Sequence, residues 1–150
     1  MRRKPADFAK DQGGIAAIEF AILGAVLCLM VVAVGDLGLG FYSYMQVQNS
    51  AQAGAQYAAV HGFNSTAVSN AVTSATSVSG ITASPAPQQF CGCASGAAVA
   101  PATCGTICAD GMSAGTYVSA GAVRDYAPLI SWPGFAASYH QTATSTVRIQ

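Results

Sequence analysis

One carboxylate lies inside the most apolar part of the sequence. Residues 15–34 form a run of twenty in which Glu19 is the only polar side chain. A charge near the centre of a lipid bilayer costs roughly 2.5–3.5 kcal/mol on insertion scales, and less toward its edge. Glu19 therefore either acts inside the membrane or lies near the cytoplasmic interface, where the positive end of a helix tolerates it.

Four cysteines follow the apolar run and offer a second kind of chemistry. Two lie in a C-x-C pair and two, after ten further residues, in a C-x3-C pair: Cys91, Cys93, Cys104 and Cys108. Structural zinc sites usually contain C-x2-C pairs and supporting histidines, and this pattern has neither. In an exported region with few large apolar residues, disulfides commonly compensate for a small core, so we expect two disulfides.

Three pairings of these four cysteines exist. A bond between Cys91 and Cys93 is strained, and both remaining arrangements staple the loop that joins the two pairs. Of these two we favour the nested one, in which Cys91 pairs with Cys108 and Cys93 pairs with Cys104. Cys28 lies in the apolar run and is most simply a small buried apolar residue.

The sequence offers no constellation of catalytic residues. His61 and His140 are isolated, and we expect Asp125 beside Arg124 to form a solvated turn pair. The acidic residues outside the first fourteen positions do not pair with one another: Glu19, Asp36, Asp110 and Asp125. No nucleophile–base spacing, phosphate-binding glycine loop or metal triad is found. We expect no enzymatic activity, no metal and no cofactor.

Charge is scarce and unevenly placed. Charged residues make up 8% of the 150 residues, against about 25% in an average soluble domain. The formal net charge is zero, so no basic excess points to nucleic acid. Four of the six basic residues precede the apolar run: Arg2, Arg3, Lys4 and Lys10. By the positive-inside rule, residues 1–14 are a cytoplasmic leader and residues 35–150 are exported.

The apolar run has the length of one membrane span. At about 1.5 Å per residue, a helix over residues 15–34 reaches about 30 Å, the thickness of a bilayer core. A cleaved secretory signal has a shorter apolar region and a nearby A-x-A site, whereas the best such site here is residues 51–53. A buried helix of a soluble protein is the alternative, but no later segment is apolar enough to surround it.

The residues around Glu19 form a motif: basic leader, Gly13-Gly14, then Ile15-Ala16-Ala17-Ile18-Glu19-Phe20. This motif resembles the prepilin processing site of the type IV pilin superfamily. The resemblance implies that a membrane-embedded aspartyl peptidase cuts after Gly14, so that Ile15 becomes the new N-terminus. The new amine and Glu19 are then one helical turn apart, the spacing at which opposite charges meet.

The whole pattern looks like the TadE-like pilus-assembly proteins of the tight-adherence system. The stretches that carry the likeness are residues 8–14, 19–20, 35–38, 47–59, 126–130 and 145–149. The resemblance implies a minor pseudopilin or assembly factor of a tight-adherence pilus, structural rather than catalytic. It implies a bacterial inner-membrane protein with its C-terminal domain in the periplasm, or in the pilus. The implied partners are the prepilin peptidase, other pseudopilins, pilus subunits and the inner-membrane assembly platform.

The sequence pattern predicts helices and strands that together form an α+β fold of pilin-like architecture. Helical spacing extends from residue 15 to residue 60, and a shorter helix capped by Asn64 or Ser65 extends to Gly80. Residues 81–115 have no sustained period and predict turns and a cysteine-bearing loop. Residues 115–123 and 142–149 predict antiparallel strands, because apolar and polar side chains alternate in the second of them.

A second class of function competes with pilus assembly. The chain could be a membrane-anchored or secreted adhesin or binding module, stapled by disulfides, whose first helix only directs it to the membrane. Aromatic and proline residues near the C-terminus either form a contact surface or, as we favour, cover the small sheet: Tyr126, Pro128, Trp132, Pro133, Phe135 and Tyr139. Cleavage after Gly14 would favour pilus assembly, and its absence would favour the adhesin.

Overall fold

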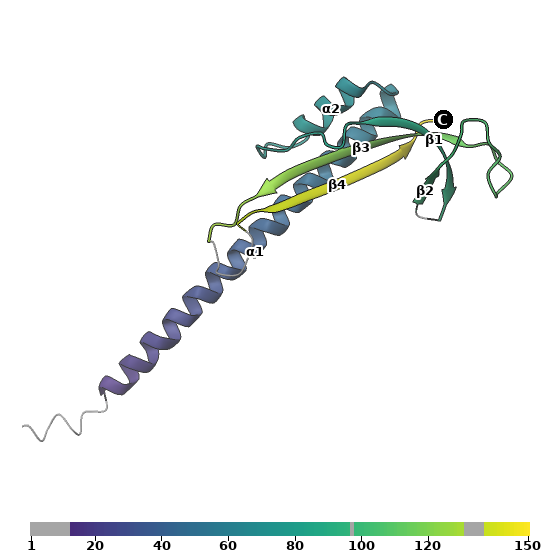
Figure 1. Ribbon diagram of the computed structural model, residues 1–150. Helices are drawn as coiled ribbons and strands as arrows, with labels where there is room; N and C mark the ends of the chain where they lie inside the picture. The colour runs from purple at the N-terminus through teal and green to yellow at the C-terminus, as the bar shows by residue number, and fades with distance from the viewer. Residues whose placement is uncertain (1–12, 97, 131–136) are drawn as a thin grey trace, which may run out of the picture. The chain divides into compact units, whose positions relative to one another are not determined.

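The structure is a computed structural model that describes residues 13–96, 98–130 and 137–150 (Figure 1). It contains two helices and four strands in the order α1 (Gly13–His61), α2 (Ser65–Ser74), β1 (Gln88–Ser95), β2 (Ala98–Pro101), β3 (Gly115–Tyr126) and β4 (Tyr139–Arg148). The chain divides into two compact units, Met1–Leu39 and Gly40–Gln150. The predicted α+β class, with a long first helix, a short second helix and a small antiparallel sheet, is confirmed.

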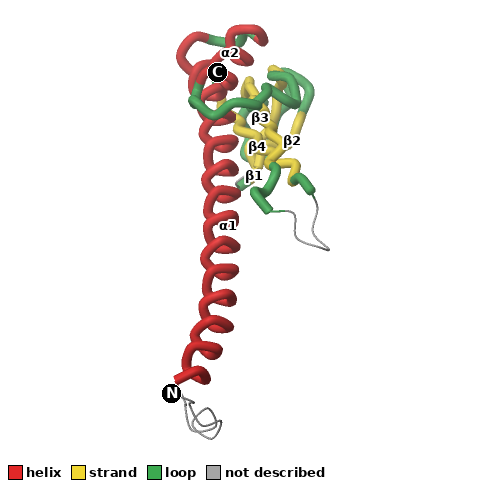
Figure 2. Tube along the Cα trace, turned by 90° about the vertical axis from the view of Figure 1, so that its left-hand side faces the viewer, coloured by secondary structure: helices red, strands yellow, loops and turns green. Residues whose placement is uncertain are grey.

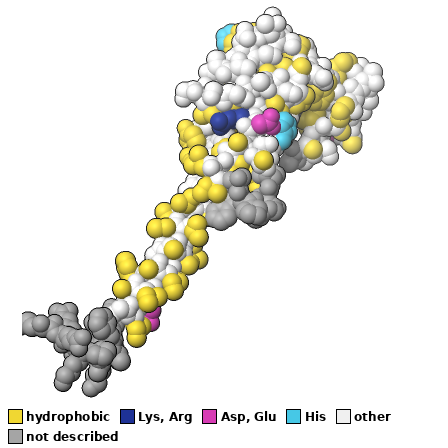
Figure 3. All heavy atoms as spheres, turned by 60° about the vertical axis from the view of Figure 1, so that its left-hand side comes forward, with side chains coloured by type: hydrophobic (Ala, Val, Ile, Leu, Met, Phe, Trp, Pro, Cys, Tyr) yellow, Lys and Arg dark blue, Asp and Glu magenta, His cyan; other side chains and the backbone are white. Residues whose placement is uncertain are grey.

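The long helix α1 matches its predicted bounds to within two residues at its N-terminus and one at its C-terminus. It ends at His61 because Gly62 adopts a positive φ of 79°, which glycine enters at no steric cost, and the Gly62 amide donates to the carbonyl of Ala58. The large apolar side chains of α1 between Ile15 and Leu39 are exposed, and Figure 3 shows many of them along the face turned toward the viewer. Such a helix needs lipid or other helices to cover it.

The second half of α1 is buried along one stripe of small residues. Their spacings of three and four place them on one face of the helix: Ser43, Val47, Ser50, Ala51, Gly54, Ala55 and Ala58. Gly54 marks the closest approach, because a Cβ built there would lie 2.4 Å from a methyl group of Val72 and 3.1 Å from the Cβ of Ala120. Small side chains thus let α1 approach both α2 and the sheet.

The second helix is shorter than the sequence predicts. Asn64 caps it as expected, with its side chain accepting a 3.0 Å hydrogen bond from the Ala67 amide. The helix ends at Ser74 instead of continuing to Gly80, so that part of the prediction is wrong. The hydroxyl groups of Thr73 and Ser74 donate to the Asn70 carbonyl, and such side-chain bonds compete with the backbone bonds of a helix.

The sheet is antiparallel and has the strand order β2-β1-β3-β4. Figure 2 shows the strands beside the part of α1 that belongs to the Gly40–Gln150 unit. The predicted strands near residues 115 and 142 are confirmed as β3 and β4, each longer at one end. The prediction of a loop throughout residues 81–115 is wrong, because β1 and β2 lie within it. Small residues hide the alternation of these strands. Gly92 of β1, for example, lies where a Cβ would meet the Ala100 carbonyl oxygen at 2.8 Å.

The core lies between α1, α2 and the face of β3 that carries Val118, Ala120 and Ala122. Val68 and Val72 of α2 complete it. Along β4, Ala143 and Val147 are half-buried and pack against this core, while the threonines between them are exposed. The predicted alternation in the last strand is therefore confirmed.

Candidate functional site

The predicted processing residues lie at the start of α1. Gly14, Ile15, Glu19 and Phe20 all belong to the helix and are all exposed. Ile15 and Glu19 are four residues apart and so lie one turn apart on the same side of the helix. The basic residues of the leader, which lie between Arg2 and Lys10, are outside the described residues. The Gly14–Ile15 bond thus lies at the beginning of α1, where residues 14–20 are all exposed.

The Glu19 carboxylate makes no hydrogen bond or ion pair with any side chain in the described ranges 13–96, 98–130 and 137–150. The side chains around it are large and apolar, with Ile15, Phe20 and Leu23 all exposed. A carboxylate in such a setting is costly in lipid unless a cation approaches it. The arrangement leaves Glu19 available to a positive group supplied after cleavage or by another chain.

One helix among the described residues, α1, is long and apolar enough to cross a membrane. Its apolar part includes the predicted span, residues 15–34, and the free cysteine Cys28. Cys28 is exposed on the isolated chain, whereas the sequence predicts a buried apolar residue there. The prediction requires lipid or neighbouring helices to cover this side chain, and a single chain provides neither.

A polar cluster links α1 to the β3–β4 hairpin, and we call its members Ser43, Arg124 and Gln141 the Ser43 cluster. Arg124 donates to the Ser43 hydroxyl at 2.7 Å, and that hydroxyl donates to the Gln141 side-chain oxygen at 2.6 Å. The Gln141 amide nitrogen donates to the Gly40 carbonyl at 3.1 Å. The hydrogen bond from Arg124 therefore holds this side chain against α1. Because its donor is charged, it is stronger than a bond between two neutral groups.

The sequence did not reveal this cluster. Arg124 was expected to form a solvated pair with its neighbour Asp125, and this expectation is wrong. Asp125 lies opposite His140 in the β3–β4 ladder, and the distance between His140 Nδ1 and Asp125 Oδ1 is 2.7 Å. Both side chains are exposed, and the prediction that His140 is isolated is wrong. Alternation along β3 separates Arg124 from Asp125, because successive side chains point to opposite faces of a sheet.

The four cysteines outside α1 form two disulfides, as expected, but the nested pairing is wrong. Cys91 bonds Cys104 and Cys93 bonds Cys108, with Cα–Cα distances of 5.2 and 5.6 Å. The Ala102 amide donates to the Cys91 carbonyl at 2.8 Å, which brings Cys104 beside Cys91. The loop then follows β1 in the same direction, so Cys108 reaches Cys93. Spacing alone does not reveal this direction.

The disulfides hold a small loop, residues 103–114, against β1. Backbone hydrogen bonds close the loop on itself, from Ala114 to Thr106 and from Cys108 to Met112. Two apolar side chains, Ile107 and Met112, are exposed at this loop, by 66% and 59%. The cross-links thus fix a loop that has no core of its own.

The aromatic residues near the C-terminus serve different contacts. The Tyr126 ring lies beside Gly40 of α1, where a built Cβ would be 3.5 Å from it, so Tyr126 contacts the helix. Tyr139 pairs with Tyr126 at the end of the ladder and is exposed. Trp132, Pro133 and Phe135 lie outside the described residues.

No group of three or more His, Cys, Asp or Glu side chains that could hold a metal occurs within the described ranges. His61, one of the two candidate histidines, stacks on Tyr57 at a centroid distance of 4.4 Å. Its Nδ1 atom lies 3.3 Å from the Tyr57 carbonyl oxygen near the C-terminus of α1. The histidine therefore contributes to the end of a helix.

Comparison with known families identifies the first part of the chain. Residues 14–56 match the family model of the TadE-like proteins. The resemblance to TadE-like pilus-assembly proteins, predicted from the motif around Glu19, is thereby confirmed. The comparisons with curated proteins and with solved structures found no match.

Proposed function

We propose that this chain is a minor pseudopilin or assembly factor of a tight-adherence pilus, with a structural rather than a catalytic role. The observation that carries the proposal is the extent of the TadE-like match. It begins at Gly14, includes Glu19 and the apolar run, and ends at residue 56 in the part of α1 that packs on the sheet. The match therefore covers the proposed processing site, the proposed membrane segment and part of the helix that packs in the core.

The first step in this function is removal of the leader by a prepilin peptidase. Hydrolysis of the Gly14–Ile15 peptide bond consumes one water molecule and leaves a carboxylate on Gly14 and an ammonium group on Ile15. The basic leader, which holds the N-terminus in the cytoplasm, is lost with residues 1–14. The mature helix then begins with an apolar residue and is free to move from lipid into a bundle of helices.

The second step joins Glu19 to a positive charge. The new ammonium group at Ile15 lies one turn from Glu19, so it can approach the carboxylate of its own chain or of a neighbour. An ion pair in a low-dielectric setting offsets the cost of burying each charge, and losing one partner leaves the other uncompensated. The pair would therefore fix the axial position of one helix against the next.

The exported unit supplies contacts outside the membrane. In this proposal residues 15–34 span the bacterial inner membrane once, and residues 35–150 lie in the periplasm. The other pseudopilins, the pilus subunits and the assembly platform are the partners of this arrangement. Two disulfides in the exported unit agree with an oxidising compartment.

N-terminal sequencing of the protein recovered from membranes tests the proposal. In cells with an active prepilin peptidase, we expect a chain that begins at Ile15, and in cells with the peptidase inactivated, a chain that keeps residues 1–14. The intact mass of the protein, measured on the same samples, determines the cleavage position independently. A chain that keeps the leader in both strains would favour a membrane-anchored adhesin, and a chain that begins after Ala53 would favour a secreted one.

A further inference from the structure

One end of the Gly40–Gln150 unit carries a group of exposed apolar and aromatic side chains. They come from the first turns of α1 in this unit and from the segments that flank the turn between β3 and β4. The group consists of Phe41, Tyr42, Tyr44, Met45, Leu129, Ile130 and Tyr139. Leu129 is exposed by 74%, although leucine is usually buried in folded proteins.

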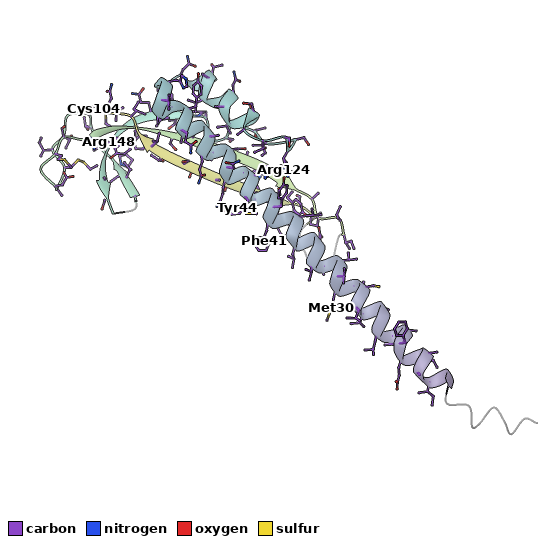
Figure 4. All side chains as sticks on the ribbon, turned by 180° about the vertical axis from the view of Figure 1, so that it is seen from behind. Met30, Phe41, Tyr44, Cys104, Arg124 and Arg148 are labelled. Carbon is purple, nitrogen blue, oxygen red and sulfur yellow. A yellow bond between two sulfur atoms is a disulfide. The ribbon has the colours of Figure 1, made fainter. Side chains whose placement is uncertain are left out.

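Contacts within the unit bring the two segments to the same end. The β3–β4 ladder ends with the pair Tyr126 and Tyr139, and the Tyr126 ring lies beside Gly40. The Gln141 side chain donates to the Gly40 carbonyl at 3.1 Å. Figure 4 shows Phe41, Tyr44 and Arg124 along this stretch of α1, with Cys104 and Arg148 at the opposite end of the unit. The chain beyond Tyr126 therefore leaves the sheet at the level of Gly40.

The lengths of two chain segments limit how far this end can lie from the membrane. Gly40 follows the end of the predicted span, Val34, by six residues, which reach at most about 20–22 Å whatever the conformation of the chain between them. The four residues from Tyr126 to Ile130 reach at most about 13 Å when extended. The polar headgroup layer adds roughly 5–7 Å to each side of the bilayer core. The connecting chain is therefore short enough for Leu129 and Ile130 to reach that layer.

We propose that Leu129 and Ile130 insert into the lipid headgroup layer on the exported side of the membrane, beside the aromatic residues of α1. The inference rests on the proposed membrane segment, residues 15–34. Tyrosine side chains such as Tyr42 and Tyr44 prefer this layer, because the ring is apolar and the phenol hydroxyl can remain hydrated. Exposed apolar side chains such as Leu129 gain by leaving water for the layer.

The bilayer is favoured over a second copy as the occupant of this surface. The anchor is covalently continuous with the unit through α1, so the membrane is always present at a high effective concentration. A second copy must diffuse to the surface and lose translational freedom when it binds. The Arg124 side chain at this end bonds Ser43. Its charge is therefore held in place and is compatible with a layer rich in phosphates.

This second attachment would hold the exported unit against the membrane before assembly. A single helix leaves the unit free to tilt about the end of the span. Contact through Leu129 and Ile130 restricts that tilt, so the small-residue stripe keeps one orientation toward neighbouring chains. Moving the chain into a pilus would then break the lipid contact.

Depth-dependent fluorescence quenching tests the proposal in the full chain. The chain is reconstituted in vesicles of phosphatidylethanolamine and phosphatidylglycerol, which carry spin-labelled lipid with the label either at the headgroup or in the middle of the acyl chain. A polarity-sensitive fluorophore is attached to one thiol without reduction of the disulfides. The labelled sites are Cys28 in the natural chain and, in a Cys28→Ser background, Leu129→Cys or Thr146→Cys.

The three sites separate the possible outcomes. We expect the probe at Cys28 to be quenched by the mid-chain label, and the probe at position 129 to be blue-shifted and quenched by the headgroup label. Thr146 is an exposed control on β4, about 23 Å along the strand from Tyr139, and we expect no quenching there. Quenching at Cys28 without quenching at position 129 overturns this inference alone, whereas no quenching at Cys28 contradicts the membrane segment itself.

A dilution series identifies a protein occupant. When the amount of protein per vesicle is lowered, contact with lipid leaves the emission at position 129 unchanged. Emission that shifts back toward the spectrum in water on dilution would show that a second copy covers the site, and it would overturn the lipid proposal.

Discussion

Two parts of the sheet are stabilised in different ways, β3 by packing against helices and β1 by disulfides. At one end, α1 and α2 cover β3, and the buried residues are mostly alanine and valine, such as Val47, Ala51 and Ala120. At the other end, two disulfides join β1 to the loop that follows β2. The comparison teaches that small side chains stabilise a fold only where another backbone can approach closely.

Close approach compensates for small size at the helix-covered end. Burial yields about 25 cal/mol per Å² of apolar area, so an alanine contributes little on its own. Because the side chains of the stripe are small, α1 and the sheet can approach closely, and their backbones then form dispersion contacts that stabilise the fold. At the β1–β2 end, cross-links lower the entropy of the unfolded chain instead.

The largest effect is expected from a charge placed in the stripe. Ala51→Asp puts a carboxylate where the native side chain is 1% exposed, and an unpaired buried charge costs several kcal/mol. We expect the exported unit of this variant to unfold. Gln52→Asp, at the exposed neighbouring position, is the matched control and should change the free energy of unfolding by less than about 0.5 kcal/mol. Urea unfolding of the full chain in detergent measures both, and equal stability of the two variants would contradict the packing.

Removal of the disulfides should have the next largest effect, and it should be local. The cross-links close loops with sequence separations of 13 and 15 residues, for which loop entropy gives about 3 kcal/mol each. We expect Cys93→Ser with Cys108→Ser to raise amide hydrogen exchange in residues 88–114 while Val118 and Ala120 remain protected. Loss of protection throughout β3 would mean that the two ends are not separate. Peptide mapping without reduction should recover the Cys91–Cys104 pair intact.

A smaller effect is expected from filling the closest approach. Gly54→Ala places a methyl group 2.4 Å from a Val72 methyl, and overpacking typically costs about 1–3 kcal/mol. The better helix propensity of alanine returns about 1 kcal/mol of this. Gly38→Ala is the control, because a Cβ there meets nothing within 4 Å. Thermal unfolding should show Gly54→Ala below the natural chain and Gly38→Ala at or above it, and the reverse order would contradict the close approach.

The smallest effect is expected at the start of α2. Asn64→Ala removes the acceptor for the Ala67 amide, and loss of such a cap costs about 1 kcal/mol. Ser65→Ala, at the exposed first residue of the helix, should leave the unfolding midpoint nearly unchanged. A similar loss in both variants would mean that the side chain of Asn64 does not cap α2.

Sequence patterns predicted the elements whose side chains alternate in size. The bounds of α1 and the alternation around Val147 follow from periodicity, and Asn64 is one of the two caps that the residue types offered. The strands β1 and β2 were missed because glycine, alanine and cysteine give no alternating signal. Their pairing depends instead on β3 and on the cross-links. Residues without distinctive side chains leave strand placement to tertiary contacts.

The residues of the candidate site also differ in whether the sequence alone reveals them. The motif around Gly14 and Glu19 is continuous in sequence, so it was found without a structure. The Ser43 cluster joins positions that are 81 and 98 residues apart, and it depends on the register of β3 and β4 against α1. The loop that pairs Cys104 with Cys91 is likewise joined to β1 by a hydrogen bond between positions eleven residues apart, from the Ala102 amide to the Cys91 carbonyl. Long-range contacts of this kind carry no local signal.

The central claim is that Glu19 acts in assembly, and the variant Glu19→Gln tests it most directly. The substitution keeps the size of the side chain and removes its charge, so insertion into lipid should be unchanged or slightly easier. We expect normal membrane fractionation, cleavage after Gly14 and a strong loss of surface pili, with Glu19→Asp intermediate. Wild-type numbers of pili on cells that carry Glu19→Gln would show that the carboxylate is only tolerated near the interface, and would contradict the account.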